Sequence, residues 1–421
     1  MAFLRSLFAG VSALRNQQTM MDVIGNNIAN VNTVGFKGGR ATFSELYAQT
    51  LQGASRPTAT TGGTNPMQVG LGMAVNTLDT MFNQGNVERT GNTFDLALSG
   101  SAFFVVNSNG TQMYTRAGNF SLDANGALVT GTGAVVQGKM ADTAGVIPQG
   151  TSLTNIVINK DIKSPAKATT TVSFAGNLNA SDDVYNAGPP ATGGKAESTA
   201  TVYDSLGNAI PITIEYTKSG SNAWNWTASI KDGQTTANVG SGTVNFDANG
   251  YYQSLTGSPI TITPTTGANP LSIDLNFGKV GEFSGITQNS GASAITMRSQ
   301  DGYTAGVLKD VNVQADGTVV GSFSNNCVLN LAKIMLAEFN NPAGLVRAGD
   351  NAFAMSGNSG TPAIVDGGET TTISAGSLEQ SNVDLADEFT KMITAQRGFQ
   401  ASARVITTSD EFLQEVVNLK R

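Results

Sequence analysis

This chain of 421 residues contains no histidine, a single cysteine and few charged residues, which make up only 13% of the sequence. Without histidine it lacks imidazole-based catalytic triads, most kinds of zinc site and the usual general base near neutral pH. The single cysteine, Cys327, excludes an intrachain disulfide and a CxxC metal or redox site. We expect Cys327 to be a buried free thiol, with a reactive or cross-linking role as the alternative. We expect no metal, no cofactor and no catalytic residue.

Positive charge and long apolar runs are also scarce. The chain has 24 Lys and Arg against 31 Asp and Glu, a net charge of −7, and no basic cluster. The footprint of a nucleic-acid-binding protein is therefore missing, and we expect no nucleic acid partner. No stretch approaches the roughly 20 apolar residues that cross a bilayer, and Arg5 interrupts the apolar start, which does not read as a secretory signal. We expect no membrane insertion, and either a cytoplasmic location or export without a cleaved signal peptide.

The middle of the chain has the pattern of β-structure. Residues 101–138 alternate strand-forming residues with Asn-Gly turns, and related turns recur as FDANG (246–250) and QADG (314–317). The aspartates of these turns lack the spacing of a calcium-binding loop. Residues 166–284 contain strands of their own and predict a second β domain inserted into the first. Trp224 and Trp226 lie two residues apart and share one face of a strand, where we expect them to pack rather than to form a sugar-binding platform.

The first 35 residues have the periodicity of an amphipathic helix. Apolar side chains recur in steps of three and four, the pattern of a helix that packs along a seam. Gly35 is placed to end the helix. The apolar residues that we expect in this seam are Leu4, Leu7, Val11, Leu14, Met21, Ile24, Ile28 and Val31.

The last 46 residues, 376–421, repeat this pattern. Asp384 is a candidate N-cap for a helix that follows it, because its carboxylate can accept from the first free backbone N–H groups. A helix of about 33 residues after this cap would be a rod of roughly 50 Å. The apolar residues that we expect in its seam are Leu385, Phe389, Met392, Phe399, Ile406, Leu413 and Val417.

Asparagines are crowded into the end of the N-terminal helix. Asn26, Asn27 and Asn30 flank the apolar stripe, although asparagine is a poor helix former. Amides beside an apolar seam fix the register of packed helices, because a slipped helix would bury them without partners. Asn32 and Gly35 leave the helical conformation readily and are expected to end the helix. The alternative is a solvated polar face followed by a C-cap.

Each terminal helix needs a partner for its apolar stripe. We expect the two to pack against each other and against helices of other copies, because an exposed apolar seam drives association. Copies that meet through surfaces that are not self-complementary form open-ended assemblies rather than closed dimers. The alternative is an ordinary helical subdomain packed within one chain.

Both terminal segments resemble signatures of the bacterial flagellar rod and hook proteins. SALRNQQTMMDVIGNNIANVNTVGFK resembles the N-terminal signature, and the segment that begins GSLEQSNVDLADEF resembles the C-terminal one. NQGNVERTGNTFDLALSGSAFFVV and YTRAGNFSLDANGALVTGTGAVVQG are similar to a domain that these proteins share. Within the family, the large insertion and YDSLGNAIPITIEY resemble the hook proteins, so the resemblance implies a hook subunit; a distal rod or hook-associated protein is the alternative.

The resemblance implies an α+β multidomain fold: a terminal helical coiled-coil domain and two mainly β domains, the second inserted in the first. The ranges are 1–35 and 376–421 for the coiled coil, 36–70 for an irregular linker, 71–165 and 285–375 for the first β domain, and 166–284 for the inserted one. It also implies a curved, hollow tube of many copies that bends as a universal joint between rod and filament.

The partners that the resemblance implies are other copies of the chain, a hook cap, distal rod and hook–filament junction proteins, and the flagellar type III export apparatus. The implied location is the flagellar hook outside the cell. A secreted carbohydrate-active enzyme is a rival, since Asp204, Glu215 and Asp274 could supply two carboxylates, but no motif unites them.

Overall fold

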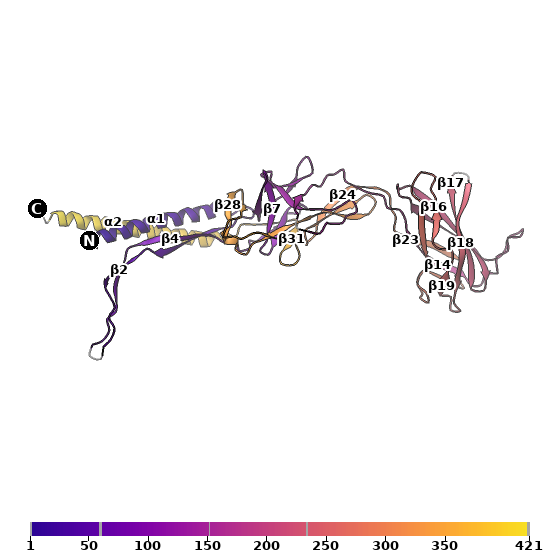
Figure 1. The fold of residues 1–421 in the computed structure, drawn as a ribbon, viewed down its shortest axis with the longest axis horizontal. Coiled ribbons are helices and arrows are strands. Elements are labelled where there is room, and N and C mark those ends of the chain that lie inside the picture. Colours follow the sequence, from indigo (N-terminus) through magenta and orange to yellow (C-terminus); the bar gives the residue numbers. More distant parts are fainter. Residues whose placement is uncertain (1, 59–60, 151, 233–234, 419–421) are drawn as a thin grey trace. The chain divides into compact units, whose positions relative to one another are not determined.

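The computed structural model describes residues 2–58, 61–150, 152–232 and 235–418. It is mostly β-structure with a helix at each end of the chain, α1 (Ala2–Ala29) and α2 (Leu385–Asn418) (Figure 1). It divides into two compact units. Unit 1 comprises Met1–Asn159, Val311–Val320 and Asn330–Arg421, and unit 2 comprises Lys160–Asp310 and Gly321–Leu329. In this coarse form, the α+β prediction is confirmed.

The N-terminal helix is shorter than the sequence predicted. It ends at Ala29, and residues 30–34 form turns in which Asn30 N donates to the carbonyls of Asn26 and Asn27, at 3.2 Å each. Gly35 does adopt the left-handed region, with φ +67°, but several residues beyond the helix. The prediction that Gly35 ends the helix is therefore wrong, because consecutive asparagine-stabilised turns end it earlier.

The C-terminal helix begins where its predicted cap places it. Asp384 Oδ1 accepts hydrogen bonds from Ala386 N at 2.8 Å and Asp387 N at 3.4 Å. Asp387 and Glu388 lie in the first turn, where negative charge complements the helix dipole. The sequence thus specifies the start of α2 through local chemistry.

The segment expected to be an irregular linker is instead strand. In unit 1, β1 (Gly39–Glu45) pairs antiparallel with β4 (Met73–Thr80), and β2 (Ala48–Gln52) pairs with β3 (Met67–Gly70). An isolated bridge between Ser55 and Thr64 extends the second ladder. Its Pro, Gly and Thr residues suggested a loop, and most of them lie between β2 and β3, whereas the strands themselves are formed by Ala48–Gln52 and Met67–Gly70. We call residues 48–70 the β2–β3 arm.

The main sheet of unit 1 surrounds an aromatic core. Its hydrogen-bonded order includes β11 (Val135–Met140), β7 (Phe103–Ser108), β8 (Thr111–Thr115), β29 (Ala352–Ala354) and β28 (Val346–Gly349). Asn109 and Gly110 turn β7 into β8 with positive φ values of 51° and 85°, as the Asn-Gly signal predicts. The core beneath contains Phe103, Val105, Tyr114, Ala337, Phe339, Leu345 and Phe353.

Shorter strands complete unit 1. Two ladders join segments from opposite ends of the sequence, β5 (Val87–Arg89) with β32 (Ser377–Glu379) and β6 (Leu96–Ser99) with β31 (Thr372–Ala375). The remaining elements are β9 (Ser121–Leu122), β10 (Leu128–Val129), β12 (Thr154–Asn155), β27 (Leu336–Glu338), β30 (Ala363–Val365) and the 3-10 turn Pro342–Gly344. Three strands have residues in both units: β24 (Gly306–Val313), β25 (Thr318–Phe323) and β26 (Val328–Ile334).

Unit 2 consists of two five-stranded sheets over one core. One is the antiparallel series β15 (Lys195–Tyr203), β16 (Ala209–Gly220), β17 (Ala223–Asp232), β18 (Thr235–Phe246) and β19 (Tyr252–Leu255). The other contains β14 (Thr171–Asn179), β20 (Ile260–Ile262), β21 (Leu271–Asn276), β22 (Ile286–Asn289) and β23 (Ala294–Gln300), and β13 (Lys163–Ser164) pairs with β24.

Two predictions concern side chains of unit 2. Trp224 and Trp226 are fully buried in its core, so the expectation that they pack is confirmed. Cys327 is free but only half-buried. The expectation of a fully buried thiol is therefore wrong, because Cys327 follows an exposed turn rather than a core strand.

Candidate functional site

The two terminal helices pack against each other in antiparallel order (Figure 1). Ser6 Oγ lies 3.2 Å from Ser409 Oγ near one end of the pair, and Asn27 Nδ2 donates to Glu388 Oε2 at 3.1 Å near the other. Residues with little or no side chain let the backbones approach. A Cβ atom on Gly10 would lie 2.9 Å from Ile406 Cγ1.

Asn27 is the asparagine that holds this arrangement. It is 1% exposed and bonds the backbone of Gly39 twice, donating to its O and accepting from its N, at 2.8 Å each. Glu388, which Asn27 also contacts, receives a second bond from Lys391 Nζ at 2.9 Å. Asn26 is exposed and accepts from Asn30 Nδ2 at 3.1 Å. Of the predicted amides, Asn27 therefore links α1, α2 and β1 within one chain.

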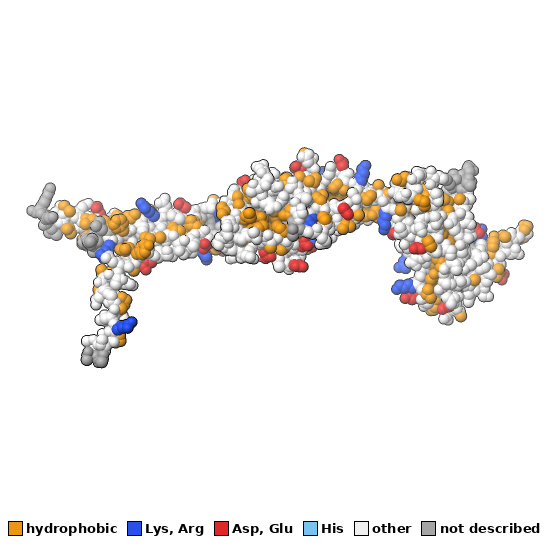
Figure 2. Space-filling model, viewed as in Figure 1, with side chains coloured by type: hydrophobic (Ala, Val, Ile, Leu, Met, Phe, Trp, Pro, Cys, Tyr) orange, Lys and Arg blue, Asp and Glu red, His pale blue; other side chains and the backbone are white. Residues whose placement is uncertain are grey.

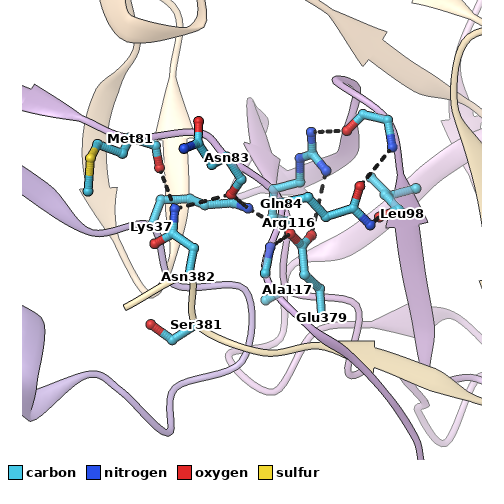
Figure 3. Close-up of polar contacts among 12 residues, drawn as sticks. Lys37, Met81, Asn83, Gln84, Leu98, Arg116, Ala117, Glu379, Ser381 and Asn382 are labelled. Carbon is cyan, nitrogen blue, oxygen red and sulfur yellow. Dashed lines mark hydrogen bonds and ion pairs between the residues drawn. The ribbon is translucent and has the colours of Figure 1, made fainter. Parts of the chain in front are cut away.

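A buried cluster of charged side chains lies where the two terminal segments meet (Figure 3). Lys37 Nζ contacts Glu379 Oε1 at 2.6 Å, and Arg116 Nη1 lies 3.5 Å from Glu379 Oε2. All three side chains are at most 1% exposed. Surrounding groups satisfy much of the cluster: Asn83 O accepts from Lys37 at 2.8 Å and Gly100 O from Arg116 at 2.6 Å. Two cations thus share one carboxylate.

Burial dominates the electrostatics of this cluster. Desolvation lowers the pKa of Lys37 below its ordinary 10.5, although the charge and hydrogen bond of Glu379 oppose it. Desolvation likewise lowers the pKa of Arg116, again against Glu379. A buried pair that loses one partner leaves an uncompensated charge, which is strongly destabilising. The cluster therefore ties Lys37, near the start of the chain, firmly to Glu379, just before α2.

Backbone-directed side chains reinforce the same junction. Asn382 Oδ1 accepts from Gly38 N, and its Nδ2 donates to Met81 O, both at 2.8 Å. Arg347 Nη2 donates to Lys37 O at 2.6 Å. The segment after α1 and the segment before α2 are therefore held to each other and to the β-structure of unit 1. Sequence reasoning missed Lys37, Arg116, Glu379 and Asn382. For the three charged residues, one signal was available: each is a charged residue within an apolar or Gly-rich motif, in a chain that has few charges.

The predicted seam residues fall into three groups. Ile24 is buried, and eight others are partly buried: Leu7, Leu14, Met21, Ile28, Val31, Met392, Ile406 and Leu413. Val11, Leu385, Phe389, Phe399 and Val417 are exposed in the single chain. The side chain of Leu4 lies outside the described residues. Only part of the predicted stripe therefore faces the partner helix.

Further apolar side chains on the two helices, outside the set predicted for the seam, are also exposed. Phe8 of α1 is 70% exposed and Ile393 of α2 is 59% exposed. Val405 and Val416 of α2 are also exposed. Figure 2 shows hydrophobic side chains at the surface of the helix pair, at the end where Figure 1 labels α1 and α2. Ile393, Val405 and Val416 lie outside the stripe that the periodicity marked on the C-terminal helix.

The carboxylates of the rival enzyme hypothesis have separate local roles. Asp204 is buried and accepts from Leu206 N, Asn208 N and Thr266 Oγ1. Glu215 of β16 pairs with Lys195 at 2.9 Å, and Asp274 lies on β21 of the other sheet. Among the described residues no three His, Cys, Asp or Glu side chains gather as metal ligands, and none of the described helices is long and apolar enough to span a bilayer.

Comparison with known protein families gives four consecutive matches. They are the flagella basal body rod protein family (residues 7–37), the flagellar hook protein FlgE/F/G D1 domain (97–179), the flagellar basal body protein FlaE D2 domain (177–303) and the flagellar basal body rod FlgEFG protein C-terminal domain (374–419). The matches include parts of both helices and of both units.

Individual proteins match over nearly their whole length. The flagellar hook protein FlgE of Borreliella burgdorferi is 41% identical over 99% of this chain and 100% of that protein. The flagellar hook protein FlgE of Escherichia coli is 37% identical over 97% of this chain and 98% of its own. The crystal structure of Helicobacter pylori flagellar hook protein FlgE2 has the same fold, with a TM-score of 0.51 at 16% identity, over 68% of this chain and 98% of that one.

Proposed function

This chain belongs to the flagellar hook protein family, and we propose that its helix pair is the part through which copies pack into the hook. It is a structural subunit of the flagellar hook and not an enzyme. One observation carries the proposal for the helix pair: α1 and α2 already contact each other, yet large apolar side chains of α2 stay exposed. Such a surface is a candidate for contact between copies.

The apolar side chains left exposed on α2 would contribute to assembly when neighbouring copies cover them. Phe389, Ile393 and Val405 are 50%, 59% and 45% exposed. Fully burying an aliphatic or aromatic side chain contributes about 1.5–3 kcal/mol. Association costs about 4–15 kcal/mol in lost freedom of motion, so several such side chains must be covered together. A subunit with many neighbours in a tube meets that requirement more readily than a dimer does.

We propose the domain organisation that the resemblance implies. Residues 1–35 and 376–421 form an inner coiled coil, 71–165 and 285–375 form the first β domain, and 166–284 form the inserted second one, with 36–70 joining coil and β-structure. The antiparallel contacts of α1 and α2 support the first element. The division of the chain near residues 160 and 310 supports a separate second domain, but it places residues 285–310, with β22 and β23, in that domain rather than in the first.

In the proposed assembly, copies form a curved tube that bends while it transmits torque from rod to filament. A sequence with only 13% charged residues supports this, because few fixed ion pairs must break as subunits slide. The proposed partners are other copies, the hook cap, the distal rod and hook–filament junction proteins, and the type III export apparatus. The proposed site is the flagellar hook outside the cell. The distal rod alternative is less well supported, because the relatives at 37–41% identity are named hook proteins.

Electron microscopy of purified, concentrated protein tests this proposal. Phe389→Ser together with Ile393→Ser should abolish tubes while leaving circular dichroism unchanged, because both side chains are exposed in the single chain. Val280→Ser with Phe283→Ser is the matched control, since these residues are 67% and 71% exposed in unit 2. Deleting 385–421 should also abolish tubes, and deleting 166–284 should give straight or polymorphic ones. Normal polymers from the helix variants would refute the role given to α2.

A further inference from the structure

Asparagine is followed directly by glycine at three places in the chain, Asn109–Gly110, Asn125–Gly126 and Asn249–Gly250. This residue pair is prone to spontaneous deamidation, because glycine has no Cβ atom to hinder attack by its own backbone nitrogen on the asparagine side chain. All three asparagines are exposed. Sequence and exposure therefore make the three sites alike, and only the turns that hold them can distinguish their reactivity.

The reaction requires the turn to open. In a hydrogen-bonded turn the glycine N–H group is already used and the asparagine backbone is fixed, so the glycine nitrogen cannot approach the side-chain carbon. The reactive geometry exists only during local opening, and local opening is more frequent where fewer contacts hold a segment. The contacts of each turn therefore predict its rate of reaction.

The turn at Asn125 is held by a carboxylate and by a neighbouring segment. Asp123 Oδ1 accepts from Asn125 N at 2.9 Å and from Ala127 N at 2.7 Å. Gly126 N donates to Asp123 O at 3.1 Å, and Gly126 O accepts from Ile158 N at 2.6 Å. Opening this turn therefore breaks contacts within it and contacts to the segment beside it.

The turn at Asn249, in unit 2, repeats this arrangement. Asp247 Oδ1 accepts from Asn249 N at 2.9 Å and from Tyr251 N at 2.8 Å. Gly250 N donates to Asp247 O at 3.1 Å, and Gly250 O accepts from Gln288 N at 2.9 Å. The same set of contacts therefore closes two turns of the same sequence, Asp-Ala-Asn-Gly, in different units.

The turn at Asn109 is held more loosely. It is the exposed tip between β7 and β8, and Gly110 N donates to the side-chain Oδ1 of Asn107 at 2.9 Å. A Cβ atom on Gly110 would meet no described atom within 4 Å, whereas a Cβ atom on Gly126 would lie 2.7 Å from Ile158 O. The surroundings of Gly110 therefore offer little resistance to opening.

We propose that Asn109 is a site of spontaneous deamidation, selected among the three by its turn. The Gly110 nitrogen attacks Asn109 Cγ, a C–N bond forms, and the bond from Cγ to Nδ2 breaks. Nδ2 leaves as ammonia and takes up the proton of Gly110 N. Water then opens the cyclic imide by breaking one of its C–N bonds. Opening at Cγ gives aspartate and opening at the backbone carbonyl carbon gives isoaspartate, so water is the only co-reactant.

The products change the turn between β7 and β8. Either product adds a negative charge to a chain whose net charge is −7. Isoaspartate also routes the backbone through the side chain, which lengthens the two-residue turn between Ser108 and Thr111 that fixes the register of the strands. β7 carries Phe103 and Val105 of the core of unit 1. Unit 1 should therefore lose stability as isoaspartate accumulates.

Peptide mass spectrometry of the full-length chain, incubated at mildly alkaline pH, tests the proposal through the mass increase that exchange of ammonia for water gives. The rate at Asn109 should exceed the rates at Asn125 and Asn249 about tenfold, the factor that corresponds to about 1.4 kcal/mol of opening free energy. In the chain unfolded in urea the three rates should converge. Equal rates in the folded chain, or the same order of rates in urea, would overturn the proposal.

Two variants separate the turn from the sequence around it. Asp123→Ala removes the acceptor of two backbone N–H groups and should raise the rate at Asn125 toward that at Asn109. The rate at Asn249 should not change, and it reports that unit 2 stays folded. An unchanged rate at Asn125 would overturn the control of reactivity by the turn.

Asn109→Gly keeps a residue suited to φ +51° but cannot react. After the same incubation, wild-type unit 1 should unfold at a lower urea concentration by circular dichroism, and unit 1 of this variant should not. An equal loss of stability in both proteins would overturn the role given to Asn109.

Discussion

Lys37 Nζ lies 2.6 Å from Glu379 Oε1, although 342 positions separate the two residues in the sequence. The pair closes unit 1 around its two terminal segments, one just after α1 and one just before α2. Both side chains are fully buried, so water can replace this contact only if the junction between the two terminal segments opens. The orientation of the helix pair relative to the β-structure of unit 1 therefore depends on this contact.

Removing the shared carboxylate should destabilise unit 1 alone. Glu379→Gln leaves the charges of Lys37 and Arg116 buried without compensation, and we expect a loss of about 3–5 kcal/mol. Far-UV circular dichroism during urea unfolding follows the helices of unit 1, whereas fluorescence follows the chain's two tryptophans, both in unit 2. Only the unfolding transition followed by circular dichroism should shift to lower urea concentration. Arg40→Ala, which breaks an exposed pair with Asp79 at 3.4 Å, should change stability by less than about 1 kcal/mol.

Two glycines of α1 should respond oppositely to alanine. A Cβ atom on Gly25 would have no neighbour within 4 Å, so Gly25→Ala should stabilise the unassembled chain by up to about 1 kcal/mol through helix propensity. Gly10→Ala would press on Ile406 and should lose about 1–3 kcal/mol. Combining Gly10→Ala with Ile406→Ala should cost less than the sum of the single changes. Thermal unfolding measures all four variants, and simple additivity would contradict the contact.

The buried amide of Asn27 should matter far more than its exposed neighbour. Asn27→Ala removes the partner of Gly39 N and O and one partner of Glu388, and each buried group left unpaired costs about 1–3 kcal/mol. Asn26→Ala should change the free energy of unfolding by less than about 0.5 kcal/mol. Urea unfolding followed by circular dichroism compares the two. Equal effects would mean that Asn27 does not hold the two helices in register.

Unit 2 should lose stability in acid through Asp301. Burial raises the pKa of Asp301, but hydrogen bonds from Thr171 N, Thr170 and Lys167 outweigh burial and hold the pKa well below the ordinary 3.8. A carboxyl group whose pKa is lower in the folded than in the unfolded state stabilises the fold at every pH above the unfolded pKa, here about 3.8. This stabilisation is lost as the pH falls from about 3.8 through the pKa of the folded state.

The matched measurement is urea unfolding followed by tryptophan fluorescence at several pH values. Asp301→Asn should be less stable than the wild type near neutral pH, and the difference should shrink as the pH drops below about 3.8. Asp274→Asn, at an exposed position of β21, is the control, and its free energy of unfolding should change with pH as that of the wild type does. A difference that stays constant across the range would rule out ionisation of Asp301 as its cause.

Local chemistry in the sequence determined several features of this protein. The Asp384 cap fixes the start of α2, Asn109 and Gly110 fix the turn between β7 and β8, and the alternation of apolar residues fixes which faces of β15 and β16 are buried. Each of these depends on residues a few positions apart, which interact in nearly any fold that contains them. The family, and with it the hook function, was readable from the two terminal motifs for the same reason.

Only the tertiary structure decided which residues meet across the chain. Periodicity marked a stripe on each helix but could not tell that the helices approach closely at Gly10 or that Phe389 and Ile393 stay exposed. It could not bring Lys37 to Glu379 and Arg116 either, since nothing local distinguishes a buried charge from a solvated one. Helix seams and buried ion clusters are set by the close packing of segments hundreds of residues apart, and that packing exists only once the chain is folded.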